Sequence, residues 1–74
     1  MKKTKANMIK ILAAMRENDI VLAKSVEKDG EDIWAARLRA EAQGLREAIW
    51  LISNYNNSFE GYGKIYFPEE FPDK

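Results

Sequence analysis

Length, composition and charge exclude several classes of function. The 74 residues suffice for one domain, and a chain this short buries only about 60% of the surface that its unfolded form exposes. Twelve Lys and Arg balance twelve Asp and Glu, so no net charge draws the chain to nucleic acid or to an anionic membrane. Because it has neither cysteine nor histidine, we expect a protein that is not an enzyme, with no catalytic residues, no metal and no cofactor.

An amphipathic helix is predicted from about residue 7 to residue 27. Either Thr4 or Asn7 can cap its start. Asn18 and Asp19 interrupt the apolar pattern and could begin a second helix, but the apolar stripe keeps its phase across them, so we favour one continuous helix. The apolar residues of this stripe recur at helical spacing: Met8, Ile11, Leu12, Met15, Leu22 and Val26.

The start of the chain combines lysines with apolar residues, as a signal peptide does. Lys10 interrupts this short apolar run and the helical periodicity continues beyond it, so we reject a signal peptide. No stretch reaches the roughly 18 apolar residues of a membrane span. We therefore expect a cytoplasmic protein with no membrane partner.

Residues 28–31 are predicted to form a turn. Gly30 can adopt a positive φ and end the first helix, and Glu31 or Asp32 suits the start of the next. An Asp-Gly pair is also typical of a β-hairpin, but the segment Trp34–Ala42 lacks the alternation of a strand. A helical hairpin is therefore favoured.

A second helix is predicted from about residue 32 to residue 54, where Ala, Leu, Glu and Arg dominate and proline is absent. Its apolar arc covers about half the circumference, which is wider than the roughly 100° stripe that faces one neighbour. We therefore expect the chain to form a homo-oligomer. The centre of the arc is formed by Trp34, Leu38, Leu45, Ile49 and Ile52, with Ala42 and Ala48 at its edges.

Small residues recur every four positions along this helix, at Ala36, Ala40, Gly44 and Ala48. Such a ridge suits close packing of another helix backbone. Gly44 destabilises a helix interior by roughly 1 kcal/mol relative to alanine. Either a packing partner explains this glycine or the helix merely tolerates it.

Charged residues interrupt the apolar arc. Arg37 and Glu41 lie one turn apart, where they can form an exposed ion pair or belong to a buried polar site. In an antiparallel hairpin, Asp19 comes level with about residue 40. We therefore expect a buried polar cluster of Asp19, Arg37 and Glu41, with an ion pair across the helices from Asp19 to Arg37.

The composition changes in the C-terminal tail, residues 55–74. Gly61, Gly63, Pro68 and Pro72 argue against another long helix. Disordered segments are poor in aromatic residues, so we expect order at least to Phe67, with residues 64–67 extended and the rings packed on the hairpin or on a neighbouring subunit. The tail carries Tyr55, Phe59, Tyr62, Tyr66, Phe67 and Phe71.

Trp50 is an apolar ring on the polar side of the second helix, and Trp beside Arg is a pair that interfaces favour. One hypothesis is that this surface binds a protein partner. A second is that an oligomer encloses a small anionic nucleotide, with arginines on the phosphates and tyrosines stacked on the base. A third, nucleic-acid binding, is disfavoured by the neutral net charge. The candidate interaction residues are Trp50, Arg46, Arg39, Tyr62, Tyr66 and Phe67.

The segment Gly44–Ile52, GLREAIWLI, resembles the closing helix of small bacteriophage and prophage helical-hairpin proteins. Those often carry a Gly-Leu-x-x-Ala-Ile run after an alanine-rich, charged stretch. Some with a comparable layout are oligomeric sponges that sequester cyclic-nucleotide immune signals, and Glu47–Trp50 is similar to theirs. The resemblance implies an accessory protein that acts in the bacterial host and inhibits a defence protein, with direct protein binding ahead of nucleotide sequestration. It carries over no binding residue.

These patterns together predict an all-α fold in a single domain, residues 1–74. It consists of an antiparallel two-helix hairpin with an extended aromatic C-terminal tail, assembled as a homo-oligomer.

Overall fold

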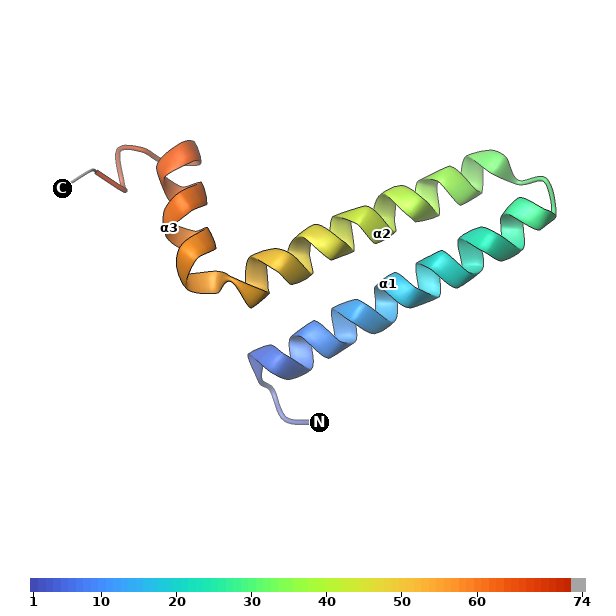
Figure 1. The fold of residues 1–74 in the computed structure, drawn as a ribbon, viewed down its shortest axis with the longest axis horizontal. Coiled ribbons are helices and arrows are strands. Elements are labelled where there is room, and N and C mark those ends of the chain that lie inside the picture. The colour runs from blue at the N-terminus through green and yellow to red at the C-terminus, as the bar shows by residue number, and fades with distance from the viewer. Residues whose placement is uncertain (73–74) are drawn as a thin grey trace.

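The computed structural model describes residues 1–72, which form three helices and no strand (Figure 1). Helix α1 spans Lys5–Lys28, α2 spans Asp32–Ser53 and α3 spans Tyr55–Tyr66. The first two run antiparallel side by side, and α3 lies beyond the open end of this hairpin. The all-α fold is confirmed. The last two residues of the predicted tail, 73 and 74, lie outside the described part.

Helix α1 is continuous through Asn18 and Asp19, as the phase of its apolar stripe predicts. Thr4 is its cap, because the Thr4 hydroxyl accepts the Asn7 backbone N–H at 3.0 Å. The helix ends at Lys28, one residue later than predicted. Gly30 then takes a φ of 82°, a conformation that glycine adopts without strain, and the chain reverses into α2.

The two helices meet along residues spaced alternately three and four apart, the spacing of a coiled-coil seam. On α1 these buried and half-buried residues are Ile9, Leu12, Arg16, Asp19, Ala23 and Val26. On α2 they are Ala35, Leu38, Ala42, Leu45, Ile49 and Ile52. The core is densest near the turn, where Ala23, Val26, Ala35 and Leu38 cluster.

The seam corrects the predicted centre of the packing face of α2. Ala35 lies in the seam at 1% exposure, whereas Trp34 lies to one side of it and stays 48% exposed. Small side chains at the contact allow two helices to approach closely. Ala35 belongs to the same buried cluster as Ala23, and these two alanines permit this approach. The adjacent tryptophan is therefore turned out of the seam.

The hairpin is a single layer of helices without a second layer on either broad face. The molecule measures 55 × 31 × 12 Å, and the shortest dimension is close to the roughly 10–12 Å diameter of one helix. Among residues 1–72 no large side chain is fully buried. Much of the apolar surface of both helices is thus left in contact with solvent.

The predicted extended tail is wrong, because Tyr55–Tyr66 is helical and so includes residues 64–66. Glycine weakens a helix by only about 1 kcal/mol, and contacts between rings one turn apart oppose this loss. The Tyr55 and Phe59 ring centroids lie 5.8 Å apart, and those of Tyr62 and Tyr66 lie 6.3 Å apart. The aromatic spacing of the tail is therefore helical.

Helix α3 packs on the end of α2, and the Nζ atom of Lys5 at the start of α1 lies 5.9 Å from the centroid of the Tyr55 ring, so most of the hairpin is left uncovered (Figure 1). At the junction, the Asn54 side-chain amide donates to the Trp50 carbonyl at 3.0 Å and ends α2. After α3 the chain folds back, and the Phe71 ring contacts Phe59 with centroids 5.2 Å apart. None of the helices in residues 1–72 combines the length and the apolar character that a membrane crossing requires.

Candidate interaction surfaces

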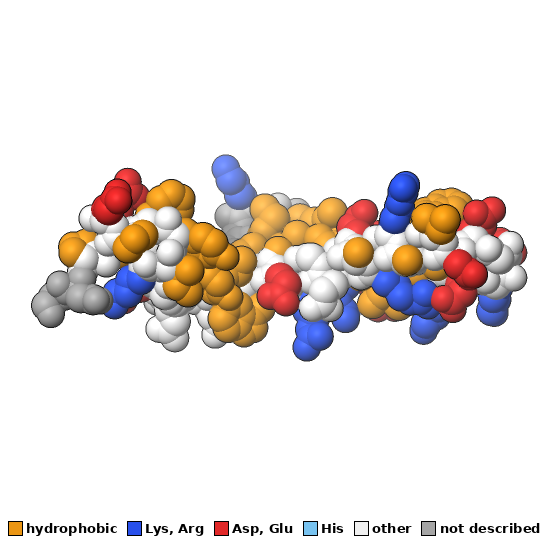
Figure 2. Space-filling model, turned by 90° about the horizontal axis from the view of Figure 1, so that it is seen from above, with side chains coloured by type: hydrophobic (Ala, Val, Ile, Leu, Met, Phe, Trp, Pro, Cys, Tyr) orange, Lys and Arg blue, Asp and Glu red, His pale blue; other side chains and the backbone are white. Residues whose placement is uncertain are grey.

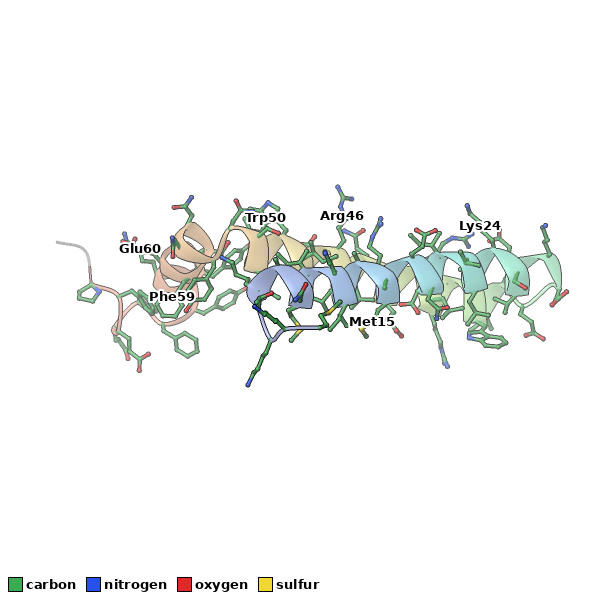
Figure 3. The ribbon with its side chains drawn as sticks, turned by 90° about the horizontal axis from the view of Figure 1, so that it is seen from below. Met15, Lys24, Arg46, Trp50, Phe59 and Glu60 are labelled. Carbon is green, nitrogen blue, oxygen red and sulfur yellow. The ribbon has the colours of Figure 1, made fainter. Side chains whose placement is uncertain are left out.

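The two broad faces of the hairpin differ in chemistry. Figure 3 shows Met15 pointing to one face, whereas Lys24, Arg46 and Trp50 point to the opposite face. In Figure 2 most of the visible Lys and Arg side chains project from one long side of the hairpin. Helical spacing extends this division to the unlabelled residues, because positions seven apart share a side of each helix.

The first surface, here named the apolar face, consists of Met8, Ile11 and Met15 on α1 and Trp34 and Leu51 on α2. All five lie on the same flank of the seam and are between 38% and 48% exposed. Met8, Ile11, Met15 and Leu51 lie toward the open end of the hairpin, and Trp34 lies near the turn. Exposed apolar patches mark interaction sites in proteins. The apolar face is therefore a candidate interface.

A polar cluster interrupts the apolar face. Asp19 is 7% exposed in the seam, and its Oδ2 atom has no hydrogen-bond partner within residues 1–72. The Asp19 carboxyl raises the pKa of Glu41, first by hydrogen bonding and then by charge repulsion. The structure therefore brings two acids together. The Nε atom of Arg16, one turn before Asp19 in the seam, is also buried and has no hydrogen-bond partner within residues 1–72.

Arg37 does not join this cluster. It is exposed, and within the described residues it forms no ion pair with Asp19 or with Glu41. Both predicted pairs are wrong, and only Asp19 of the predicted buried cluster is buried. The reason is rotational: position 41 borders the seam beside Asp19, whereas position 37 lies further round the helix and points away from α1.

The second surface, here named the charged face, consists of Lys24, Glu27, Arg39, Arg46 and Trp50. Arg39 donates to both carboxylate oxygens of Glu27, at 2.5 and 3.2 Å. This contact lowers the pKa of Glu27 and raises the pKa of Arg39. Arg39 is therefore engaged within the hairpin and lies away from the other predicted interaction residues.

Four of the predicted interaction residues do gather at the end of the charged face. The Trp50 ring meets Tyr62 edge to face, with centroids 6.2 Å apart, and Tyr62 stacks on Tyr66. Arg46 joins Trp50 and Tyr62 around a hollow of about 340 Å³. Gln43 and Glu47 complete this hollow, and neither was among the candidate interaction residues. Their spacing of four residues, which permits the 3.3 Å hydrogen bond between them, was the available signal.

A larger apolar hollow of about 510 Å³ lies between the end of α2 and α3. Leu51 and Phe59 line it, and Phe67, 61% exposed, lies here and not beside Trp50. Ser58 and Phe71 also line this hollow, and sequence reasoning missed both. The Ser58 hydroxyl is buried and has no hydrogen-bond partner in the described chain.

The predicted ridge of small residues does not serve the contact between α1 and α2. Ala36, Ala40 and Gly44 are exposed, and Ala48 is half-buried. A Cβ atom built on Gly44 meets nothing within 4 Å, so its side of the helix is open. Close packing at Gly44 thus requires a helix from outside the hairpin.

Within residues 1–72, no group of three or more acidic, cysteine or histidine side chains is placed to bind a metal ion. Comparison with protein families, with curated proteins and with solved structures found no match to this chain. The fold therefore defines the structural class of the protein, which is a small all-α protein whose helical hairpin is one layer thick.

Proposed function

We propose that this protein acts by stoichiometric binding: it assembles as a homo-oligomer and uses the residues around Trp50 to bind and inhibit a host defence protein. The observation that supports this most directly is the aromatic group at the end of the charged face. Trp50 is 50% exposed, and its edge contact with Tyr62 holds the ring in place. A large ring that is ordered before binding loses little entropy when a partner covers it.

The residue types at this site suit a protein interface. Trp, Tyr and Arg are the residues that contribute most to binding when a partner buries them. Trp50, Tyr62 and Arg46 supply all three around one hollow. The resemblance of Gly44–Ile52 to phage accessory proteins supports a bacterial host protein as the target, encountered in the host cytoplasm.

The test uses the chain as bait in bacterial cells, followed by reconstitution with the purified host protein that it captures. We expect a fixed stoichiometry by calorimetry and at least tenfold weaker binding for Trp50→Ser. Ile33→Ser is the matched control, because Ile33 is also an exposed apolar residue of α2. Equal binding by Trp50→Ser and Ile33→Ser, or no binding by any purified host protein, would contradict the proposal.

A second candidate function is sequestration of a small anionic nucleotide, favoured by Arg46 beside stacked rings. Arginine pairs with phosphate, and tyrosine or tryptophan can stack on a base. A thermal-shift panel of cyclic and linear nucleotides separates the two functions, because a ligand that binds the folded state raises its melting temperature. A rise that Arg46→Gln abolishes supports sequestration, whereas a flat panel favours the protein partner.

A further inference from the structure

We propose that a second copy of this chain covers the apolar face, so that two hairpins stack antiparallel, face to face, and form a four-helix bundle. This inference rests on the self-association in the proposed function and names the surface and the register that perform it. Three features of the apolar face support a second copy as its occupant: the spacing of its residues, the exposed area and the sizes of the side chains along α2.

The apolar face has the spacing of a second coiled-coil seam. On each helix it belongs to an outer row, which is the seam row shifted by one residue and therefore rotated by about 100° around the helix. In a four-helix bundle each helix packs on two neighbours in different directions, so it needs two such rows. The outer row of α1 is Met8, Ile11, Met15, Asn18, Leu22 and Ser25. The outer row of α2 is Trp34, Arg37, Glu41, Gly44, Ala48 and Leu51.

The exposed area is large enough for a second layer. The chain exposes 6224 Å², about 1,500 Å² more than the roughly 4,700 Å² of a compact monomer of its mass of 8.5 kDa. A stable interface of standard size covers roughly 800 Å² on each partner. The single-layer hairpin thus carries enough excess surface for one such interface.

The outer row of α2 changes from large side chains in its first half to smaller ones in its second half. In a two-fold dimer, if residue i of one copy contacts residue j of the other, then j also contacts i. A two-fold axis that lies between the stacked hairpins, perpendicular to the helices and level with residues 42 and 43, makes the two α2 helices antiparallel. Large side chains of one copy then face smaller ones of the other. The facing pairs are Trp34 with Leu51, Arg37 with Ala48, and Glu41 with Gly44.

Gly44 lies beside this axis, where the two α2 backbones come closest. A Cβ atom built on Gly44 meets nothing within 4 Å, so the second backbone has room to approach. The Arg37 stem can cover Ala48 of the other copy while its guanidinium stays in solvent at the edge of the interface. Glu41 keeps its contact with Asp19 of its own copy. This arrangement gives a glycine in mid-helix a packing role.

The same axis also matches the outer row of α1. Because Asp19 lies against Glu41, the axis crosses α1 level with residues 18 and 19. Met15 of one copy then faces Leu22 of the other, and Asn18 lies over its own equivalent. One asparagine in the seam of a coiled coil can fix the register, because its amide both donates and accepts hydrogen bonds.

This register covers the apolar face from end to end. Met8, its outermost residue, comes level with Asp29 of the other copy, at the end of the facing hairpin. Ile11 comes level with Val26, one turn further in. The five residues of the apolar face therefore all lie within the length of the second hairpin.

The decisive test is disulfide formation between copies, because the chain has no cysteine of its own. Arg37→Cys and Ala48→Cys, mixed in equal amounts and oxidised, should form a mixed disulfide, since the register places the two positions face to face. Each variant alone should cross-link little, because its two equivalent positions lie roughly 16 Å apart along the helices. Arg39→Cys mixed with Arg46→Cys is the matched control: the two positions are symmetric about the same axis but lie on the charged face, and should not cross-link.

Sedimentation tests the close approach at the axis. We expect wild-type dimers and at least tenfold weaker association for Gly44→Leu, because its side chain separates the two α2 backbones although leucine favours a helix over glycine. Gln43→Leu is the matched control, since position 43 lies on the charged face, and it should leave the dimer unchanged. Circular dichroism checks that each variant remains helical. If Arg37→Cys or Ala48→Cys unfolds, Trp34→Cys with Leu51→Cys supplies a second facing pair.

The possible outcomes separate this inference from the proposed function. A single helical chain at micromolar concentration would overturn both this interface and the proposed self-association. A wild-type dimer whose facing cysteine pairs do not cross-link, or whose control pair cross-links equally well, would overturn this interface and leave the proposed self-association standing. Undiminished association of Gly44→Leu would exclude the register.

Discussion

At the scale of single residues, the pair of acids beside the seam is the feature of greatest consequence. Asp19 occupies a seam position where the pattern calls for an apolar residue. Its carboxyl lies against Glu41, and one turn earlier in the seam the Nε atom of Arg16 is buried without a hydrogen-bond partner in the described residues. Each of these residues is ordinary in itself, but their arrangement leaves like charges together on a surface that is otherwise apolar.

The raised pKa of Glu41 predicts a pH dependence of stability. A carboxyl whose pKa is raised on folding stabilises the folded chain below its unfolded pKa, and this stabilisation is lost as pH rises through the folded pKa. We therefore expect the stability of Glu41→Gln, relative to wild type, to increase as the pH is raised from about 4 to about 7. Urea denaturation at low protein concentration measures this difference.

The difference must be measured against a control because other carboxyls titrate in the same range. The lowered pKa of Glu27 has the opposite sign and removes stability as pH falls. Glu17→Gln, on the exposed side of α1, should show no comparable change with pH. If the free energy of unfolding of Glu41→Gln changed with pH in parallel with that of wild type, Asp19 and Glu41 would not interact.

At the scale of helices, α3 illustrates how a few ring contacts decide a conformation. Two glycines and the neighbouring asparagines argue against a helix, yet ring contacts one turn apart and the 3.5 Å ion pair from Lys64 to Glu60 accompany one. The two glycines differ in surroundings. A Cβ atom on Gly61 meets nothing within 4 Å, whereas one on Gly63 would overlap the ring of Phe71.

This contrast predicts opposite effects of the same substitution. Gly61→Ala should stabilise α3 by roughly 1 kcal/mol, because alanine favours a helix over glycine. Gly63→Ala should not, because its methyl group displaces Phe71 and breaks the contact of Phe71 with Phe59. Helix content through thermal unfolding compares the two variants. Equal stabilisation by both would mean that Phe71 does not pack on Gly63.

At the scale of the whole molecule, the single layer is the property that matters. A hairpin of this size cannot bury the apolar arc of either helix completely, because each helix has only one neighbour along most of its length. The exposed Met8, Ile11, Met15, Trp34 and Leu51 fall on one side of the seam, whereas Lys24 and Arg46 point to the other (Figure 3). Such a molecule presents two surfaces of different chemistry.

We expect Trp34→Ser to weaken self-association while leaving the unfolding of the isolated hairpin nearly unchanged. Trp34 is half-exposed and lies outside the seam, so its removal opens little of the core. Val21→Ser is the control, because Val21 is an exposed apolar residue on the outer side of α1. Sedimentation over a range of concentrations compares them. Association that is as strong in Trp34→Ser as in Val21→Ser would remove Trp34 from the interface.

Particular residues show how far the sequence predicted the fold. The unbroken phase of the apolar stripe predicted a continuous α1. Thr4 was one of two candidate caps for its start, and Gly30 predicted its end. These signals are local, since a cap or a positive φ depends on a few neighbouring residues. The tail was predicted wrongly because its glycine and proline content was weighted above the helical spacing of its rings.

The candidate sites were predicted less well, because they depend on how the helices are rotated. Trp50 and Tyr62 were both expected to interact, but their mutual contact required α3 to turn beside the end of α2. Asp19 was expected near Glu41 and Arg37, and the structure kept only the first neighbour. A rotation of α2 by part of a turn decides which of the two side chains borders the seam.

The sequence by itself determined that the chain is helical, that it reverses at Gly30 and that its helices carry wide apolar arcs. Helix formation and caps are local, and the 3.6-residue period alone sets the width of an arc. Only the tertiary structure decided that Ala35 and not Trp34 lies in the seam, and that Asp19 lies against Glu41. A helix with a wide apolar arc can rotate about its own axis and still bury the same apolar area against its neighbour. Close packing between small side chains selects one of these rotations.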